Sequence, residues 1–187
     1  NTLILKTAKQ EIHLSLLGGR ITKLFLNDYA KNGTDKDKAL DLIKHIEGAP
    51  HPLGVYAGEL NDAWVKYSQV SGPRPVNGAI ELNQPATIVL EGRLTDGRSI
   101  RKSLSFEPET YNLKVDLSLS ASDTKGSAME LEWTEFVSSK DLSSFLNPYD
   151  ASGFSWFDGE AADRLNFSSL EKSSQALGKQ KWLATSD

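Results

Sequence analysis

Polar and apolar residues alternate along much of this chain. The clearest alternation runs from residue 111 to residue 120, where every second residue is apolar and the residues between them are polar. Side chains of a β-strand point alternately to the two faces of a sheet, so this pattern predicts a strand with one buried and one solvated face. Shorter alternations predict further strands near residues 3–7, 12–16, 20–26, 63–70, 129–133, 153–158 and 165–168.

The segment 129–133 is expected to bury its apolar residues and to expose its carboxylates. Glu130 and Glu132 alternate with Met129, Leu131 and Trp133, and Glu135 follows them. Paired carboxylates perform acid–base chemistry only where their environments separate their pKa values, and no such environment is evident in the sequence. We therefore expect these carboxylates to lie on a solvated face, with a bulge or the strand end at 135–136.

The strongest hairpin prediction joins residues 86–94 to residues 98–106 through a turn that contains Asp-Gly. A two-residue loop would place polar side chains opposite apolar ones. A three-residue loop instead places Ile88 opposite Leu104 and keeps the apolar side chains on one face, which decides the register. Gly97 then takes the left-handed backbone conformation that such a loop requires.

The same register places Lys102 on the apolar side of the hairpin, opposite Leu90. A lysine can keep its ammonium group in water while its aliphatic stem packs against apolar neighbours. We therefore expect Lys102 to reach solvent at the edge of the sheet rather than to form part of a site.

One segment has helical rather than strand periodicity. Between residues 34 and 47, apolar residues recur every three residues, a Thr stands at the start, and Gly48 follows the end. Ser or Thr commonly caps the first turn of a helix and Gly commonly ends the last, so the pattern predicts one short helix in a β-rich chain.

Size and composition narrow the class of protein. The 187 residues fit one domain, and we expect a single β domain over residues 1–187. With 39% hydrophobic and 25% charged residues, the chain matches neither a disordered nor a membrane-embedded protein. No stretch approaches the roughly 20 apolar residues of a membrane span. The net charge of -4 argues against a nucleic-acid surface, and the absence of Cys excludes disulfides and Cys-ligated metals.

A search for catalytic motifs finds none. The histidines His13, His45 and His51 match no metal-ligand spacing, and we expect them to be solvated surface residues. The pair Gly18-Gly19 lacks the Lys-Ser/Thr of a phosphate-binding loop and is interpreted as a tight turn or a close backbone approach. We therefore predict no catalytic residue, no cofactor and no bound metal.

Aromatic residues offer the best candidates for a binding surface. Trp and Tyr suit half-wet surfaces, because their rings are apolar and carry one polar group. The alternative is that these residues fill the core, and the usual burial of large aromatic side chains favours that interpretation. The candidates for a groove or a partner contact are Trp64, Tyr67, Trp133 and Trp156.

Four segments, read in order, resemble a known domain. Residues 12–29 read IHLSLLGGRITKLFLNDY, residues 52–56 read PLGVY, residues 95–117 read TDGRSIRKSLSFEPETYNLKVDL, and residues 181–187 read KWLATSD. In order and spacing they resemble the periplasmic domain of the YidC membrane protein insertase family. The first segment is similar to that family's strand, Gly-Gly turn and strand ending in Leu-x-x-Tyr. The third resembles its strand, acidic turn and Tyr-x-x-x-Val strand.

The resemblance implies an antiparallel β-supersandwich, a fold shared with galactose mutarotase. It implies a domain at the periplasmic face of the bacterial inner membrane, in a protein whose transmembrane part inserts and folds membrane proteins. The implied partners are Sec translocon subunits and membrane-protein substrates. That family's domain continues past the last of the four segments, so we expect this chain to lack the C-terminal strands.

Two functions from different classes follow. The first is a non-catalytic domain of an insertase. The alternative is a sugar-binding or mutarotase-like enzyme domain on the same fold. Mutarotation needs a general acid and a general base at a sugar oxygen, and a shared fold does not by itself supply them. We therefore favour the non-catalytic domain.

Overall fold

The computed structural model describes residues 2–30, 39–43, 45, 48–120, 129–134, 153–157, 160, 162–166 and 182–186. The chain divides into two compact units, Asn1–Glu135 and Phe136–Asp187. Every regular element in the described part is a strand, so the predicted all-β class is confirmed.

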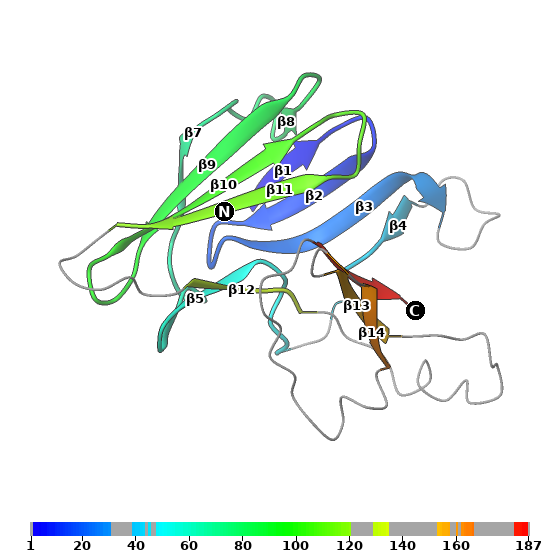
Figure 1. Cartoon of the computed structure of the whole chain (residues 1–187). Coiled ribbons are helices and arrows are strands. Elements are labelled where there is room, and N and C mark those ends of the chain that lie inside the picture. Colours follow the sequence, from blue (N-terminus) through cyan, green and yellow to red (C-terminus); the bar gives the residue numbers. More distant parts are fainter. Residues whose placement is uncertain are drawn as a thin grey trace. The chain divides into compact units, whose positions relative to one another are not determined.

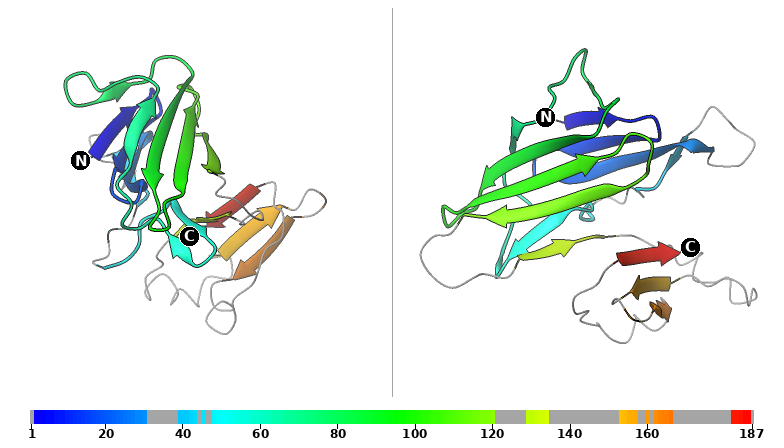
Figure 2. Two further views of the ribbon diagram at one scale, coloured as in Figure 1. Left: turned by 90° about the vertical axis from the view of Figure 1, so that its left-hand side faces the viewer. Right: turned by 45° about the horizontal axis from the view of Figure 1, so that its top comes forward.

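The first unit is a sandwich of two main sheets that lie over each other (Figures 1 and 2). One sheet has the order β4-β3-β2-β1-β8 and the other has the order β11-β10-β9-β7. Neighbouring strands are antiparallel, except that β1 and β8 run parallel. The strands of the first sheet are β1 (Thr2–Lys6), β2 (Gln10–Ser15), β3 (Arg20–Ala30), β4 (Ala39–Asp41) and β8 (Ile80–Glu81). Those of the second are β7 (Ser68–Ser71), β9 (Ala86–Arg93), β10 (Ser99–Phe106) and β11 (Leu113–Leu119).

Two smaller antiparallel sheets complete the described elements. In the first unit, the order β12-β5-β6 joins β5 (Gly54–Ala57), β6 (Leu60–Asn61) and β12 (Met129–Glu132). In the second unit, the order β14-β13-β15 joins β13 (Gly153–Phe157), β14 (Ala162–Asn166) and β15 (Trp182–Ser186).

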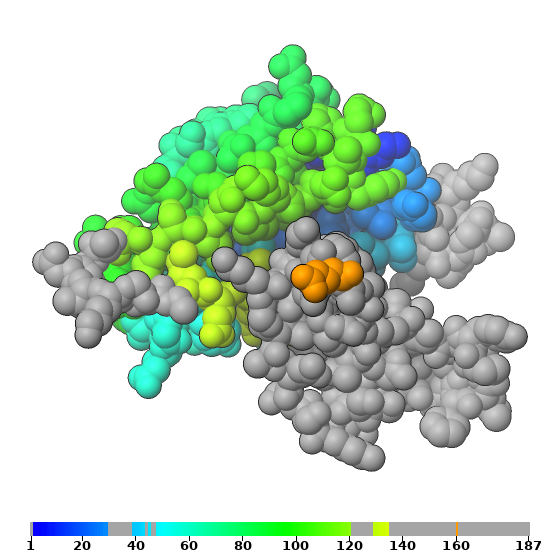
Figure 3. All heavy atoms as spheres, viewed as in Figure 1, coloured from blue at the N-terminus to red at the C-terminus, as the bar shows by residue number. Residues whose placement is uncertain are grey.

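The hydrophobic core lies between the inward faces of the two main sheets. Alternate residues of β2 and β10 point into it, as their period-two patterns predict. Full burial of each such Leu or Ile stabilises the fold by about 1.5–3 kcal/mol. The green side chains of the second sheet cover much of the face seen in Figure 3. Fully buried core residues include Leu5, Ile12, Leu14, Ile21, Ile88, Leu90, Ile100, Leu104 and Phe106.

The hairpin of β9 and β10 has the predicted register. Ile88 pairs with Leu104. The backbone N–H of Leu94 donates to the carbonyl of Arg98 at 2.9 Å, which closes a three-residue loop. Gly97 has a φ of +89°, so the left-handed conformation expected for this position is also confirmed.

The helix predicted between residues 34 and 47 is wrong where the structure describes the segment. Ala39–Asp41 form β4, and Leu40 pairs with Leu26 of β3. Asp41 Oδ1 accepts a hydrogen bond from the backbone N–H of Leu24 at 3.1 Å. The edge of β3 supplies backbone partners that local periodicity does not reveal, and pairing with them favours the strand. The remainder of this prediction falls largely outside the described residues.

The predicted faces of the segment 129–133 are wrong for Leu131, Glu132 and Trp133, whereas Glu130 is exposed as predicted. Leu131 is 46% exposed and Trp133 is 49% exposed, whereas Glu132 is half-buried. The Glu132 carboxylate accepts a hydrogen bond from Arg20, which is itself buried. A buried guanidinium without a partner is costly, and this requirement outweighs the apolar pattern of a four-residue strand. The bulge or strand end expected at 135–136 lies outside the described residues.

Candidate functional site

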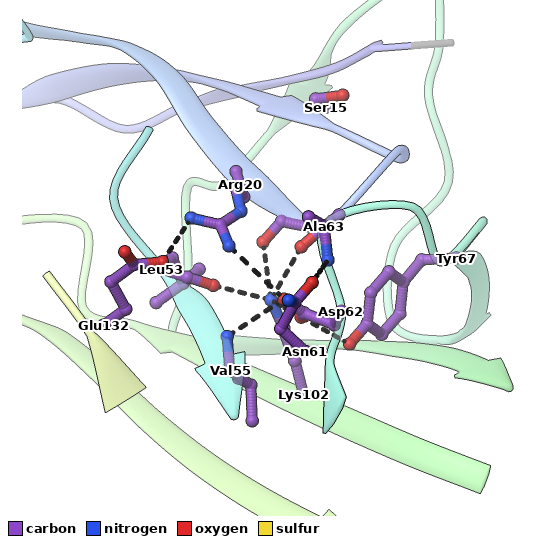
Figure 4. Close-up of polar contacts among 12 residues, drawn as sticks. Ser15, Arg20, Leu53, Val55, Asn61, Asp62, Ala63, Tyr67, Lys102 and Glu132 are labelled. Carbon is purple, nitrogen blue, oxygen red and sulfur yellow. Dashed lines mark hydrogen bonds and ion pairs between the residues drawn. The ribbon is translucent and has the colours of Figure 1, made fainter. Parts of the chain in front are cut away.

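The centre of the first unit contains a buried charge cluster made of Arg20, Asp62, Tyr67, Lys102 and Glu132 (Figure 4). Lys102 and Asp62 have no exposed surface. Such charges are almost never fully buried unless they are paired, which makes this cluster the most unusual feature of the described structure.

Lys102 does not reach solvent at a sheet edge, so the predicted location of its ammonium group is wrong. It pairs with Leu90, as the register required, but β10 lies between β9 and β11 in the interior of its sheet. The side chain therefore extends into the core on the same face as Leu104. A lysine keeps its charge in water only where a path to solvent exists, and the centre of a sandwich offers none.

Oxygen atoms surround the Lys102 ammonium group. Its Nζ lies 2.6 Å from Asp62 Oδ2. It donates to the backbone carbonyls of Gly18, Gly19 and Leu53, which lie 2.9, 3.1 and 2.6 Å away. Burial lowers the pKa of Lys102 to about 8, although the neighbouring Asp62 carboxylate favours the charged form.

The Gly18-Gly19 pair is both a tight turn and a close backbone approach, as predicted. Gly18 and Gly19 have φ values of +74° and +55° between β2 and β3. A Cβ on Gly19 would lie 3.1 Å from Lys102 Nζ, so the glycine leaves room for the ammonium group. The turn therefore directs the carbonyl oxygens of Gly18 and Gly19 toward Lys102, a role that the sequence pattern did not reveal.

Asp62 is fixed by the turn that follows β6. Its Oδ1 accepts the backbone N–H of Val55 at 2.9 Å, and its Oδ2 accepts the Tyr67 hydroxyl at 2.8 Å. Burial raises the pKa of Tyr67 far above its ordinary value, and the Asp62 carboxylate raises it further. The phenol therefore stays protonated and donates to the aspartate.

Arg20, at the start of β3, connects the cluster to β12. Its guanidinium donates to Glu132 Oε2 at 2.7 Å and to the backbone carbonyl of His51 at 2.8 Å, and it lies 3.7 Å from Asp62 Oδ1. A Cβ on Gly54 of β5 would collide with the Arg20 guanidinium and the Glu132 carboxylate. Glycine at this position is what allows the arginine to cross β5 and reach its partner.

The buried charge cluster is poorly suited to catalysis, because Asp62 and Lys102 are already hydrogen-bonded within the protein and are not exposed. A general base needs a free lone pair and access to substrate, and a nucleophile needs both as well. Both oxygens of Asp62 already accept hydrogen bonds, and all protons of Lys102 have acceptors. Because neither side chain is exposed, the arrangement ties the two sheets and the β5–β12 sheet together rather than presenting a reactive group.

The three aromatic candidates in the first unit differ in their exposure to solvent. Trp64 is 84% exposed, so the core location that we favoured is wrong for it, whereas Tyr67 is 4% exposed and belongs to the buried charge cluster. Trp133, the residue after β12, is half-exposed. The backbone of Trp156 lies in β13, and its side chain lies outside the described residues. No ring contact joins Trp64, Tyr67 and Trp133 within the described structure.

The histidines lie at two separate places. His13 Nε2 lies 2.7 Å from Glu11 Oε1 on the outer face of β2. The rings of His45 and His51 stack with their centroids 5.4 Å apart. Burial lowers the pKa of His51, and His45 and Arg20 lower it further. Among the described residues, no three side chains of His, Cys, Asp or Glu are arranged to hold a metal.

Sequence reasoning missed most of the cluster. Lys102 carried a visible signal, because it interrupts the apolar face of a strand. Asp62 and Arg20 carried none, since polar residues near turns are ordinary. Their roles become apparent only when β3, β10 and the turn after β6 are brought together.

Comparison with known families gives one result. The family described as the YidC periplasmic domain matches residues 3–187, which span both compact units. No curated protein sequence matches the chain. In the described part of the structure, no helix combines the length and the apolarity needed to cross a membrane.

Proposed function

This chain belongs to the YidC periplasmic domain family, and we propose that it is a non-catalytic periplasmic part of an inner-membrane protein insertase. In this proposal, the chain assists the insertion and folding of membrane proteins by its parent and offers a docking surface to a Sec translocon subunit. The observation that carries the proposal is the family match over residues 3–187.

The geometry of the buried charge cluster supports a structural role for the charged residues. Lys102 and Asp62 are saturated by hydrogen bonds from within the protein and have no exposed surface. A cluster of this kind stabilises one arrangement of the sheets and leaves contact with partners to the outer surface. Function then depends on surface residues and not on Tyr67 and Lys102, the buried groups whose pKa values are strongly shifted.

The test uses the complete insertase and a variant from which the segment matching residues 3–187 is deleted. Two quantities are measured on the same preparations: co-purification of the Sec translocon, and insertion of a substrate that does not require Sec. We expect the deletion to reduce co-purification more than it reduces insertion, because docking is assigned to this domain and the membrane path is not.

A matched control replaces the segment with an unrelated β domain of similar length. This replacement keeps the spacing between the flanking parts of the parent and removes the specific surface. Recovery of co-purification by the unrelated domain would mean that the segment acts as a spacer. Loss of insertion with unchanged co-purification would contradict the docking role outright.

A further inference from the structure

Trp64 is the most exposed large apolar side chain in the described part of the chain, at 84%. It lies at the tip of a turn in which the backbone N–H of Val65 donates to the carbonyl of Asp62 at 3.0 Å. Leu17, which is 41% exposed, forms an isolated antiparallel β-bridge with Lys66, two residues before β7. An apolar protrusion of Trp and Leu is thus presented to solvent at one place.

The turn that carries Trp64 is fixed from both sides. Its first residue is Asp62, which the buried charge cluster holds through Lys102 and Tyr67. The backbone N–H of Gly18 donates to the carbonyl of Val65 at 2.8 Å, and the backbone N–H of Tyr67 donates to the carbonyl of Leu16 at 2.7 Å. Figure 4 shows Asp62 and Ala63 of this turn, with Asn61 of β6 before them, near Lys102. Because the backbone of the turn is already held in place, little backbone entropy is lost when Trp64 binds a partner.

Two exposed cations lie beside this protrusion. Ser68 of β7 pairs with Glu91 of β9, and continuing that register places Lys66 next to Arg93. Both side chains are exposed. In the part of the chain that the structure describes, neither forms an ion pair. Like charges on neighbouring strands are unfavourable, so the pair suits an anion supplied from outside.

We propose that Leu17, Trp64, Lys66 and Arg93, called here the Trp64 surface, bind the anionic phospholipid surface of the membrane. Trp concentrates at bilayer interfaces, where its ring reaches the acyl chains and its N–H reaches the headgroups. Lys and Arg beside it attract anionic headgroups. The surface carries these two cations, and Glu91, the carboxylate two residues before Arg93, is paired with Arg101, although the chain as a whole has a net charge of -4.

A protein partner fits the same residues less well. Trp and Arg are common in protein interfaces, but Lys is depleted there. Interface anchors also lie in the centre of a broad contact surrounded by residues that exclude water. Trp64 is instead 84% exposed on a turn, with the exposed Lys66 two residues away. The lipid surface therefore accounts for more of the observed features.

This inference rests on the proposed function, because membership in an insertase places the domain beside a bilayer. Attachment to the membrane raises the effective lipid concentration at the domain, so a weak contact is sufficient to orient it. A lipid contact of the Trp64 surface would fix which face of the domain is turned toward the bilayer.

The direct test measures quenching of Trp64 fluorescence by brominated lipids. The 187-residue chain, with Trp133, Trp156 and Trp182 replaced by Phe, is mixed with vesicles of phosphatidylethanolamine and phosphatidylglycerol that carry brominated acyl chains. Circular dichroism checks that the variant keeps its β structure. We expect quenching that grows with the phosphatidylglycerol fraction and falls with added salt.

Charge removal tests the contribution of the cations. Lys66→Gln and Arg93→Gln are each expected to weaken partitioning by about fivefold. Lys114→Gln is the matched control, because Lys114 is a strongly exposed lysine on β11, and it should leave partitioning unchanged. Absence of quenching, or quenching equally strong on neutral phosphatidylcholine vesicles, would overturn the inference.

A parallel measurement in the complete insertase separates this inference from the proposed function. If Trp64→Ala reduces co-purification of the translocon while vesicle quenching is absent, the Trp64 surface binds protein and the lipid inference is wrong. If vesicle quenching occurs and deletion of the domain leaves co-purification unchanged, the lipid inference holds and the proposed docking role fails. Trp133→Ala serves as the control for loss of an exposed tryptophan.

Discussion

Lys102 and Asp62 form an ion pair in a place where neither charge contacts water. Taking both charges out of water costs several kcal/mol per ion, and only good geometry with further hydrogen bonds offsets this. The carbonyls of Gly18, Gly19 and Leu53, the Val55 N–H and the Tyr67 hydroxyl supply those bonds. The pair therefore contributes mainly to the uniqueness of the arrangement, since any other packing would leave a charge unpaired.

Removal of either partner should be strongly destabilising. Lys102→Met leaves the Asp62 carboxylate buried without its cation, and Asp62→Asn leaves the ammonium group without its anion. We expect each substitution to lower the free energy of unfolding by about 3–5 kcal/mol. The double variant should lose less than the sum of the two, because it buries no unpaired charge. The free energies of unfolding of the three variants are measured by urea unfolding monitored by circular dichroism.

The exposed pair Lys114 and Asp116 on β11 is the control for this cycle. Their charged atoms lie 3.1 Å apart, and the side chains are 73% and 58% exposed. Solvent screens such pairs, so Lys114→Met and Asp116→Asn should show a coupling close to zero. If the losses of unfolding free energy in Lys102→Met and Asp62→Asn also add up in the double variant, the buried pair is not energetically coupled.

At the scale of elements, the β9–β10 hairpin shows how a turn and a sheet face select the same register. The three-residue loop places Ile88 opposite Leu104, and both side chains are fully buried. Slipping by one residue would turn every side chain of β10 to the other face and would remove Lys102 from Asp62. The buried charge cluster thus reinforces a register that the apolar pattern already favours.

Gly97 is the residue on which that loop depends. Its φ is +89°, and a Cβ at this position would meet no other atom within 4 Å. Gly97→Val should therefore destabilise through backbone strain alone, by about 1–3 kcal/mol. Gly97→Asn should cost less, because Asn tolerates positive φ better than a β-branched residue does. Equal midpoints for the two variants in urea unfolding would exclude backbone strain as the cause.

At the scale of the whole molecule, the β-sandwich is a fold on which enzymes and binding domains both occur, so the architecture does not choose between them. The choice depends on reactive groups that substrate can reach. Within the described residues, Lys102 and Tyr67 have strongly shifted pKa values and are buried in the core, and Trp64 is the most exposed large apolar side chain.

Sugar mutarotation is the sharpest test of the enzymatic alternative. It requires a general acid and a general base at a sugar oxygen, and His and Glu are the residues to examine. We expect the chain to leave the rate of galactose and glucose mutarotation, followed by polarimetry, at its uncatalysed value. An accelerated rate that is lost in His13→Gln, His45→Gln or His51→Gln variants would establish an enzyme.

The sequence by itself determined the features that depend on contacts between neighbouring positions. Period-two alternation specified β11, and face matching with a flexible glycine specified the β9–β10 register. The order of short motifs specified the family over residues 3–187. The strand and the register are local features, each encoded within one or two adjacent elements, whereas the family is encoded in the order of motifs along the whole chain.

Only the tertiary structure decided the rest. β4 is a strand because the edge of β3 is available to it, and Glu132 turns inward because Arg20 needs a partner. Lys102 is buried because β10 has a strand on each side and Asp62 arrives from a distant turn. In each case the free energy comes from pairing groups far apart in the sequence. A pattern read along the chain shows that a charge is present but does not show which partner the fold brings to it.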